Sequence, residues 1–165
     1  MGVFVMKQLY IKQKMFTLSE KFTVTDEFEM PQYYVEGSFF KIPKEFIVTD
    51  QFGSEIARIT KKFLSFLPKF FVEVSGEDPI VLTKEFTFFK ARYSIDAKGI
   101  NVEGNWWDMN FSVYVGGRQV AIIDQRWFSW GDTYEVQILD ESLEHLIISL
   151  VIAIDCVKAD ESNNG

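Results

Sequence analysis

Few residues in this chain have the types that acid–base or nucleophilic chemistry needs. His145 is the only histidine, and Cys156 is the only cysteine. A Ser-His-Asp or Cys-His device would have to use His145, which the sequence places in an apolar helix beside Leu146. One histidine and one cysteine leave only scattered carboxylates as metal ligands, and no Gly-rich phosphate loop of either standard pattern is present. We therefore expect no catalytic residue, no metal site, no cofactor and no enzymatic activity.

Two acidic residues near tryptophans offer a second kind of chemistry. Asp108 follows a tryptophan pair, and Asp132 lies two residues after Trp130. Carboxylates beside aromatic rings occur where sugars are bound or hydrolysed. Trp106 and Trp127, however, fall at the core positions of the repeat described below. Packing is therefore the favoured explanation for these aromatic residues.

The basic residues give the strongest functional signal. In a strand, residues two apart share a face, so Lys12 points outward where Ile11 points inward. The same alternation places Lys14, Lys62, Lys69 and Arg92 outward, and Lys90 lies at a bend. We call these residues the predicted basic set: Lys12, Lys14, Lys62, Lys69, Lys90 and Arg92. Side by side, these residues would form a patch for phosphate oxygens. The alternative is that outward lysines keep strands soluble and discourage edge pairing.

The charge distribution limits the partners of such a patch. The net charge is −7, which opposes general attraction to phosphate-rich surfaces. Residues 1–92 hold 13 Lys and Arg against 12 Asp and Glu, whereas residues 93–165 hold 4 against 12. A locally basic face can therefore exist on an acidic protein. Nucleic acid is the weaker option, because the chain also lacks a reading motif.

A sixfold repeat indicates the elements that position these residues. Six stretches share an aromatic residue at the second place and Val or Ile at the fourth: KFTVTD, EFIVTD, KFFVEV, RYSIDA, NFSVYV and TYEVQI. This is the two-residue period of a half-buried strand. Before each stretch lies another strand-like segment, whose inward aliphatic residues recur at offsets of 24, 24, 23, 20 and 21: Ile11, Val35, Ile59, Leu82, Val102 and Ile123. Turn clusters between the units favour antiparallel neighbours.

One position of the repeat conflicts with an apolar interior. Two residues after each aliphatic residue come Gln13, Gly37, Lys61, Lys84, Gly104 and Gln125. The glycines would permit close approach of a helix. Lysines facing a dry interior would be costly, unless a β-bulge turned them outward. The sequence leaves the orientation of Lys61 and Lys84 open.

The last element has a helical period. Residues 140–158 place apolar side chains nearly all round a helix, which predicts burial on all sides. The uninterrupted apolar run, 146–154, is about half of what a bilayer needs. We therefore expect one domain over 1–165, mainly β. It would be a closed antiparallel barrel of about twelve strands over about 8–139, with a core helix over about 140–158 and a frayed tail over 159–165.

The matching segments resemble the LURP-one-related family, in its bacterial YxjI branch, within the tubby C-terminal-like superfamily. They cover nearly the whole chain: LYIKQK at 9–14, YYVEGSFFKIP at 33–43, FLSFLPKFFVEV at 63–74, NWWDMNF at 105–111, WFSWGDTYEVQI at 127–138 and LVIAIDCVKAD at 150–160. The resemblance implies a twelve-stranded barrel around a central C-terminal hydrophobic helix. The superfamily is similar to phospholipid scramblases in fold, and its tubby members bind phosphoinositide head groups through basic residues. No motif transfers that site residue by residue.

These expectations combine into a functional hypothesis. The chain would be a non-catalytic binding or scaffold domain that recognises anionic phospholipid head groups through its outer basic patch. The start, 1–6, lacks the apolar region of a secretory signal, which favours the cytoplasm and a peripheral place at the inner membrane face. Met1 and Met6 are both candidate starts. The alternatives are a protein-interaction scaffold without lipid binding and a pocket-bearing enzyme or carrier, and the oligomeric state stays open.

Overall fold

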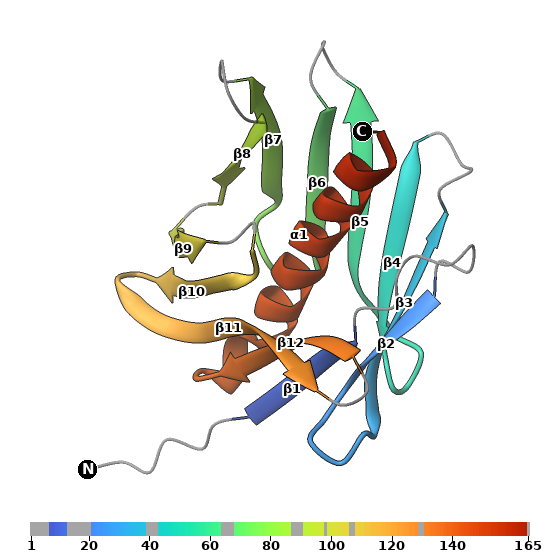
Figure 1. Ribbon diagram of the computed structural model, residues 1–165, viewed down its shortest axis with the longest axis vertical. Coiled ribbons are helices and arrows are strands. Elements are labelled where there is room, and N and C mark those ends of the chain that lie inside the picture. The colour runs from blue at the N-terminus through green and yellow to red at the C-terminus, as the bar shows by residue number, and fades with distance from the viewer. Residues whose placement is uncertain are drawn as a thin grey trace.

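The structure is a computed structural model in which most of the chain can be described. The described residues are 7–12, 21–38, 43–63, 68–86, 91–97, 99–105, 108–128 and 131–164. They form twelve strands, one short 3-10 helix and one α-helix (Figure 1). The strands are β1 (Lys7–Lys12), β2 (Lys21–Thr25), β3 (Pro31–Ser38), β4 (Lys44–Asp50), β5 (Glu55–Phe63), β6 (Pro68–Val74), β7 (Ile80–Phe86), β8 (Ala91–Asp96), β9 (Ile100–Asn105), β10 (Asn110–Val115), β11 (Arg118–Phe128) and β12 (Gly131–Ile138).

The strands form a single antiparallel sheet that curls into a nearly closed barrel. Its hydrogen-bonded order is β8-β7-β6-β5-β4-β3-β2-β1-β12-β11-β10-β9. Consecutive strands are therefore neighbours except β8 and β9, and the first and last strands, β1 and β12, pair with each other. The expected closed barrel is corrected at one seam, since β8 and β9 are the two edges of the sheet. Figure 1 shows β9 and β10 running across the direction of β7 and β8, so these edges diverge.

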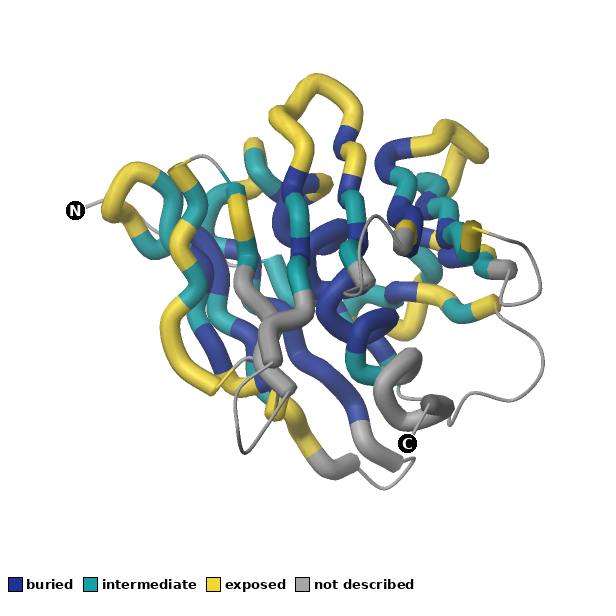
Figure 2. The backbone as a smooth tube through the Cα atoms, turned by 90° about the horizontal axis from the view of Figure 1, so that it is seen from above, coloured by how far each residue is buried: buried dark blue, intermediate teal, exposed yellow. Residues whose placement is uncertain are grey.

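The predicted core helix is confirmed, with shifted ends. Asp140 caps a 3-10 turn, Glu141–Leu143, by accepting a hydrogen bond from the Ser142 amide, and α1 follows as Glu144–Asn164. Hydrogen bonds from Ser142, and then the Arg118 guanidinium, lower the pKa of Asp140. The helix thus begins later than expected and continues to Asn164 rather than ending at residue 158. Every residue of α1 over 146–157 is buried, and Figure 2 shows this backbone inside the ring of strands.

Alternate residues of the strands complete the core. Five of the six inward aliphatic residues of the repeat are fully or almost fully buried: Ile11, Val35, Ile59, Leu82 and Ile123. Val102 is only partly buried, on the edge strand β9. The two-residue period therefore predicted the inward face of most of the barrel.

The glycines of the repeat make room for a neighbouring strand, rather than for the helix as expected. A Cβ atom at Gly37 would lie 2.3 Å from ring carbons of Phe46 on the neighbouring β4. At Gly104, φ is +111°, and a Cβ atom would lie 2.8 Å from the Asn110 carbonyl oxygen. The space beside these glycines is therefore filled by the adjacent strand, not by α1.

Candidate functional site

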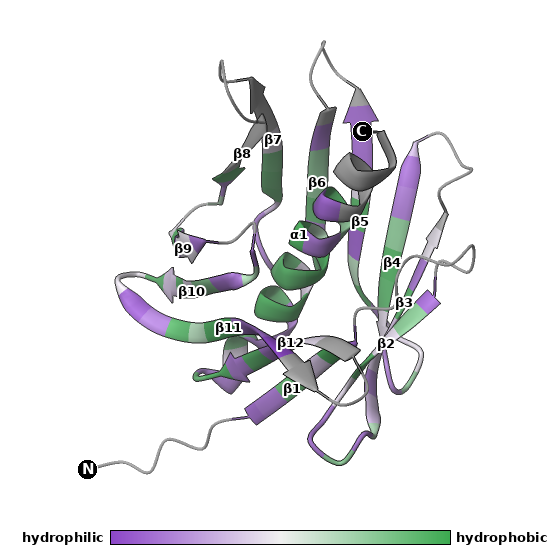
Figure 3. Cartoon of the chain, viewed as in Figure 1, coloured by the Kyte–Doolittle hydropathy of each residue, from purple (hydrophilic) through white to green (hydrophobic). Residues whose placement is uncertain are grey.

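The two ends of the barrel differ in the charged residues that they hold. We call the end at which α1 begins the acidic end, because three of its described turns, 26–30, 75–79 and 139–143, hold seven carboxylates and no lysine or arginine. Lys7 and Arg118 lie at the same end and pair with Glu144 and Asp140. We call the other the basic end. It is defined by Lys44, Lys61, Lys62 and Lys69 on the strands and Lys158 on α1. In Figure 3 the upper parts of β4 and β5, beside the last turns of α1, have the hydrophilic colour.

The outer face of the basic end brings two predicted residues together. Lys62 on β5 and Lys69 on β6 are directly opposite in the antiparallel register. Lys62 is exposed and Lys69 half-buried. The Lys62 ammonium lies 5.1 Å from the ring centroid of Phe71, so an aromatic face supports this cation from below. Within the part of the chain that the structure describes, neither lysine has a carboxylate partner.

The inner face of the basic end holds lysines that the sequence did not assign to a site. Lys61 points into the barrel with 5% of its surface exposed, and its ammonium lies 5.9 Å from the Phe70 ring centroid. Lys44 is its cross-strand neighbour and lies two residues before the buried Phe46. The question that the sequence left open is thus answered for Lys61. The two-residue period of β4 would have predicted that Lys44 shares the inward face of Phe46.

The last turns of α1 add a charged group to this interior. Lys158 is half-buried, with its ammonium 5.5 Å from the Tyr134 ring centroid, and burial lowers its pKa. One turn earlier, burial raises the pKa of Asp155 to about 6. The Tyr134 hydroxyl and the Lys158 ammonium only partly offset this effect. A buried carboxyl group and a half-buried amine therefore face β12 from the same side of the helix.

The other members of the predicted basic set do not all join this surface. Lys12 on β1 forms an ion pair with Glu29 at 3.1 Å. Three strands separate β1 from β5, about 19 Å at the usual strand spacing. Arg92 pairs with Glu85 in the β7–β8 register, but its side chain lies outside the described part. Lys14 and Lys90 lie outside the described residues, as does the side chain of Lys84.

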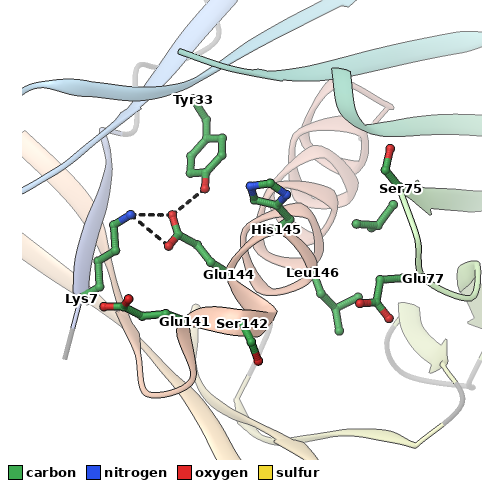
Figure 4. Close-up of a pocket in the computed structure, with 10 residues that line it drawn as sticks. Lys7, Tyr33, Ser75, Glu77, Glu141, Ser142, Glu144, His145 and Leu146 are labelled. Atoms are coloured by element: carbon green, nitrogen blue, oxygen red, sulfur yellow. Dashed lines mark hydrogen bonds and ion pairs between the residues drawn. The ribbon is translucent and has the colours of Figure 1, made fainter. Parts of the chain in front are cut away.

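At the acidic end, a pocket of about 340 Å³ opens beside the start of α1 (Figure 4). The carboxylate of Glu144 accepts hydrogen bonds from the Lys7 ammonium at 2.9 and 3.0 Å and from the Tyr33 hydroxyl at 2.5 Å. Burial, and then the hydrogen bond to Glu144, raise the pKa of Tyr33. Three elements, β1, β3 and α1, therefore meet in one hydrogen-bonded group. No sequence pattern indicates this group, since Glu144 lies more than 100 residues from both Lys7 and Tyr33.

His145 lines the same pocket. Its ring packs edge-on against Tyr33, with the centroids 5.8 Å apart. The Ser142 hydroxyl donates to Asp140, and the Ser149 hydroxyl donates to the backbone carbonyl of His145. No group of three or more His, Cys, Asp or Glu residues in the described ranges could hold a metal ion.

The carboxylates near the tryptophans are only partly described. Asp108 is exposed and bonded to Asn105, whose side-chain oxygen accepts from the Asp108 amide at 3.1 Å. Trp106 and Trp130 lie outside the described residues, as does the side chain of Asp132. The predicted packing of these aromatic residues therefore stays a prediction.

The described strands and α1 define a class of protein, a twelve-stranded, nearly closed barrel around a C-terminal helix. The fold is similar to that in the X-ray structure of the Arabidopsis thaliana protein AT5G01750. The TM-score is 0.62 at 20% identity, over 92% of this chain and 91% of that one. Among the helices of the described part, none is long and apolar enough to span a bilayer.

The family model of LURP-one-related proteins matches residues 7–155, and the chain belongs to this family. It is also 30% identical over 160 residues to the uncharacterised protein YxjI of Bacillus subtilis strain 168. That match covers 97% of this chain and 99% of the relative. The resemblance read from the sequence is therefore confirmed.

Proposed function

We propose that the chain is a non-catalytic binding domain that recognises anionic phospholipid head groups at its basic end, peripherally at the inner face of a membrane. The observation that carries this proposal is the Lys62–Lys69 pair. Like charges directly opposite in an antiparallel pair destabilise a sheet. A phosphate placed between the two ammonium groups would remove that repulsion and accept hydrogen bonds from both.

The surroundings of this pair support an anion more than they support a metal or a neutral ligand. Lys61 and Lys44 bring two further ammonium groups to the inner side of the same strand ends. Seven carboxylates of the described turns 26–30, 75–79 and 139–143 lie at the opposite end of the barrel, whereas Asp108, in the turn before β10, lies near Lys158 at this end. The net charge of −7 therefore does not act evenly on an approaching membrane. We infer a short-range attraction that depends on the orientation of the barrel.

Co-sedimentation with liposomes tests the proposal. Neutral and anionic liposomes are compared at low and moderate salt, with the parent protein and with Lys62→Gln/Lys69→Gln. The parent should sediment with anionic liposomes at low salt, and less so as salt screens the contact. Each lysine near an anionic surface contributes about 1 kcal/mol, so the double variant should lose about tenfold or more in binding.

Two controls make the result specific. Gln51→Glu/Ser75→Glu brings the net charge to −9, as the lysine variant does, but changes exposed residues at the acidic end. It should bind anionic liposomes nearly as well as the parent. Lys62→Arg/Lys69→Arg keeps the charge and should retain binding. If the parent fails to sediment with anionic liposomes at low salt, the lipid proposal is wrong and a protein-interaction scaffold becomes the default.

A further inference from the structure

The turn between β2 and β3 exposes the side chain of Phe28 to solvent. The Asp26 carboxylate accepts hydrogen bonds from the amides of Phe28 and Met30, both at 2.9 Å. The Asp26 amide donates to the Met30 carbonyl at 3.0 Å, and Glu29 takes a positive φ of 61°. These bonds fix the backbone of the turn, so Phe28 is presented in one backbone conformation.

The turn between β4 and β5 repeats this arrangement 24 residues later, at the offset of the sequence repeat. The Asp50 carboxylate accepts from the amides of Phe52 and Ser54, both at 2.9 Å. The Asp50 amide donates to the Ser54 carbonyl at 2.9 Å, and Gly53 takes the positive φ of 83°. The two turns therefore present a phenylalanine at the same position of the same scaffold.

These phenylalanines belong to a patch confined to one part of the surface. The exposed large hydrophobic residues of the described chain are Phe28 at 76%, Met30 at 59%, Tyr34 at 44% and Phe52 at 85%. All lie on β3 or on the turns that flank the neighbouring strands β3 and β4. Single exposed apolar residues are normal in proteins, but a gathered set marks an interaction surface. We call these four residues the aromatic patch.

The charge around the aromatic patch selects the kind of partner. Residues 26–30 and 50–55 contain five carboxylates and no lysine or arginine. Glu29 is paired with Lys12, and Glu55 with Arg58. Asp26, Glu27 and Asp50 have no cationic partner among the described residues. An anionic membrane or a nucleic acid would be repelled here, whereas lysine or arginine side chains would be attracted.

We propose that the aromatic patch is a docking surface for a basic segment of a partner protein that also carries apolar side chains. The apolar side chains would cover Phe28 and Phe52, while the basic ones would face Glu27 and Asp50. Because both turns are held by their own hydrogen bonds, little ordering of this chain would accompany binding. The surface lies at the opposite end from the Lys62–Lys69 pair, so lipid and protein partner could be bound together. This inference does not depend on lipid binding.

The test uses a fluorescent synthetic peptide of Lys, Leu and Phe, with binding followed by anisotropy on the full chain. Phe28→Ala/Phe52→Ala should lower the affinity by about tenfold or more, because exposed aromatic anchors dominate such contacts. Glu27→Lys should weaken binding and reduce its salt dependence. Both phenylalanines are exposed, so the melting temperature should stay within about 2 °C of the parent. Lys62→Gln/Lys69→Gln, at the other end, should bind the peptide as the parent does.

Several outcomes would overturn the assignment. If the parent does not bind the peptide, the patch is not an aromatic docking surface. The same conclusion follows if a peptide of Lys and Ser with equal charge binds as tightly. Loss of anionic-liposome binding in Phe28→Ala/Phe52→Ala would place the patch against lipid. Self-association of the parent in sedimentation, abolished by the same variant, would assign the patch to a second copy. Failure of the lipid proposal alone leaves these readouts unchanged.

Discussion

A buried carboxylate near each end of α1 has different partners. Near the first turn, Glu144 accepts three hydrogen bonds, two from the Lys7 ammonium and one from the Tyr33 hydroxyl. Near the last turns, burial raises the pKa of Asp155 to about 6, and its neighbours offset this only in part. The difference shows that partners supplied by the strands, rather than depth in the barrel alone, decide how well a buried charge is tolerated.

Between these two ends every side chain of the helix over 146–154 is buried, and Ser149 is the only polar one among them. Leu150→Asp or Val151→Asp would place an unpaired carboxylate against the fully buried centre of the barrel. We expect a loss of about 5 kcal/mol or more, enough to abolish folding. Circular dichroism and thermal unfolding measure it. Val151→Ala is the control, which should cost about 2 kcal/mol and stay folded. A Val151→Asp protein that melts near the parent temperature would contradict the core position of α1.

Asp155→Asn should change how stability depends on pH. The ordinary pKa of this group is 3.8, and the folded-state pKa is about 6. Between these values the folded state holds the proton more tightly, so the stability of the parent falls as pH rises through this window. The variant has no such proton. Its free energy of unfolding relative to the parent should therefore rise by about 2 kcal/mol between pH 4 and pH 7.

Urea unfolding at several pH values gives this difference. Asp78→Asn is the control and should show little of it, because it removes an exposed carboxylate in the turn between β6 and β7, at the other end of the barrel. A constant difference between Asp155→Asn and the parent across the window would mean that Asp155 ionises as freely as an exposed carboxyl group.

At the other end of the helix, Tyr33→Phe should destabilise the folded protein at neutral pH. The variant removes a hydrogen bond to a charged, buried acceptor, which costs about 2 kcal/mol. Lys7→Met should cost less, about 1 kcal/mol, because Lys7 is partly exposed and its ion pair is screened. The double variant tests whether the two partners act together on Glu144. Strict additivity would show that they do not.

The smallest expected effect concerns the basic end. Lys69→Glu replaces the repulsion opposite Lys62 by attraction and should raise the free energy of unfolding by about 0.5 kcal/mol. Lys62→Glu should gain less, since it gives up the contact with the Phe71 ring. Thermal unfolding at low salt compares the two variants. A loss of stability in Lys69→Glu would mean that the lysine pair carries no strain for a phosphate to relieve.

The sequence by itself determined the strand and helix pattern of this protein. The two-residue period assigned inward residues such as Ile59 and outward residues such as Lys62, because neighbours along a strand must face opposite sides. The apolar circumference of 146–154 predicted the buried helix, since such a surface is stable only when covered. Turn residues such as Asp26 and Asp50 marked the reversals, because their carboxylates bond to nearby amides.

Only the tertiary structure decided which of these elements meet, and in what register. Lys62 and Lys69 become opposite because β5 and β6 pair without a shift, whereas Lys12 is held by Glu29 on another part of the sheet. Tyr33 and Lys7 reach Glu144 because the curled sheet brings β1 and β3 to the start of α1. Such contacts depend on the closure of the barrel, in which each partner is set by strands far away in the chain. Local periodicity says nothing about contacts between distant strands. The sequence could therefore predict which face of a strand each residue lies on, but not which residues pair across strands.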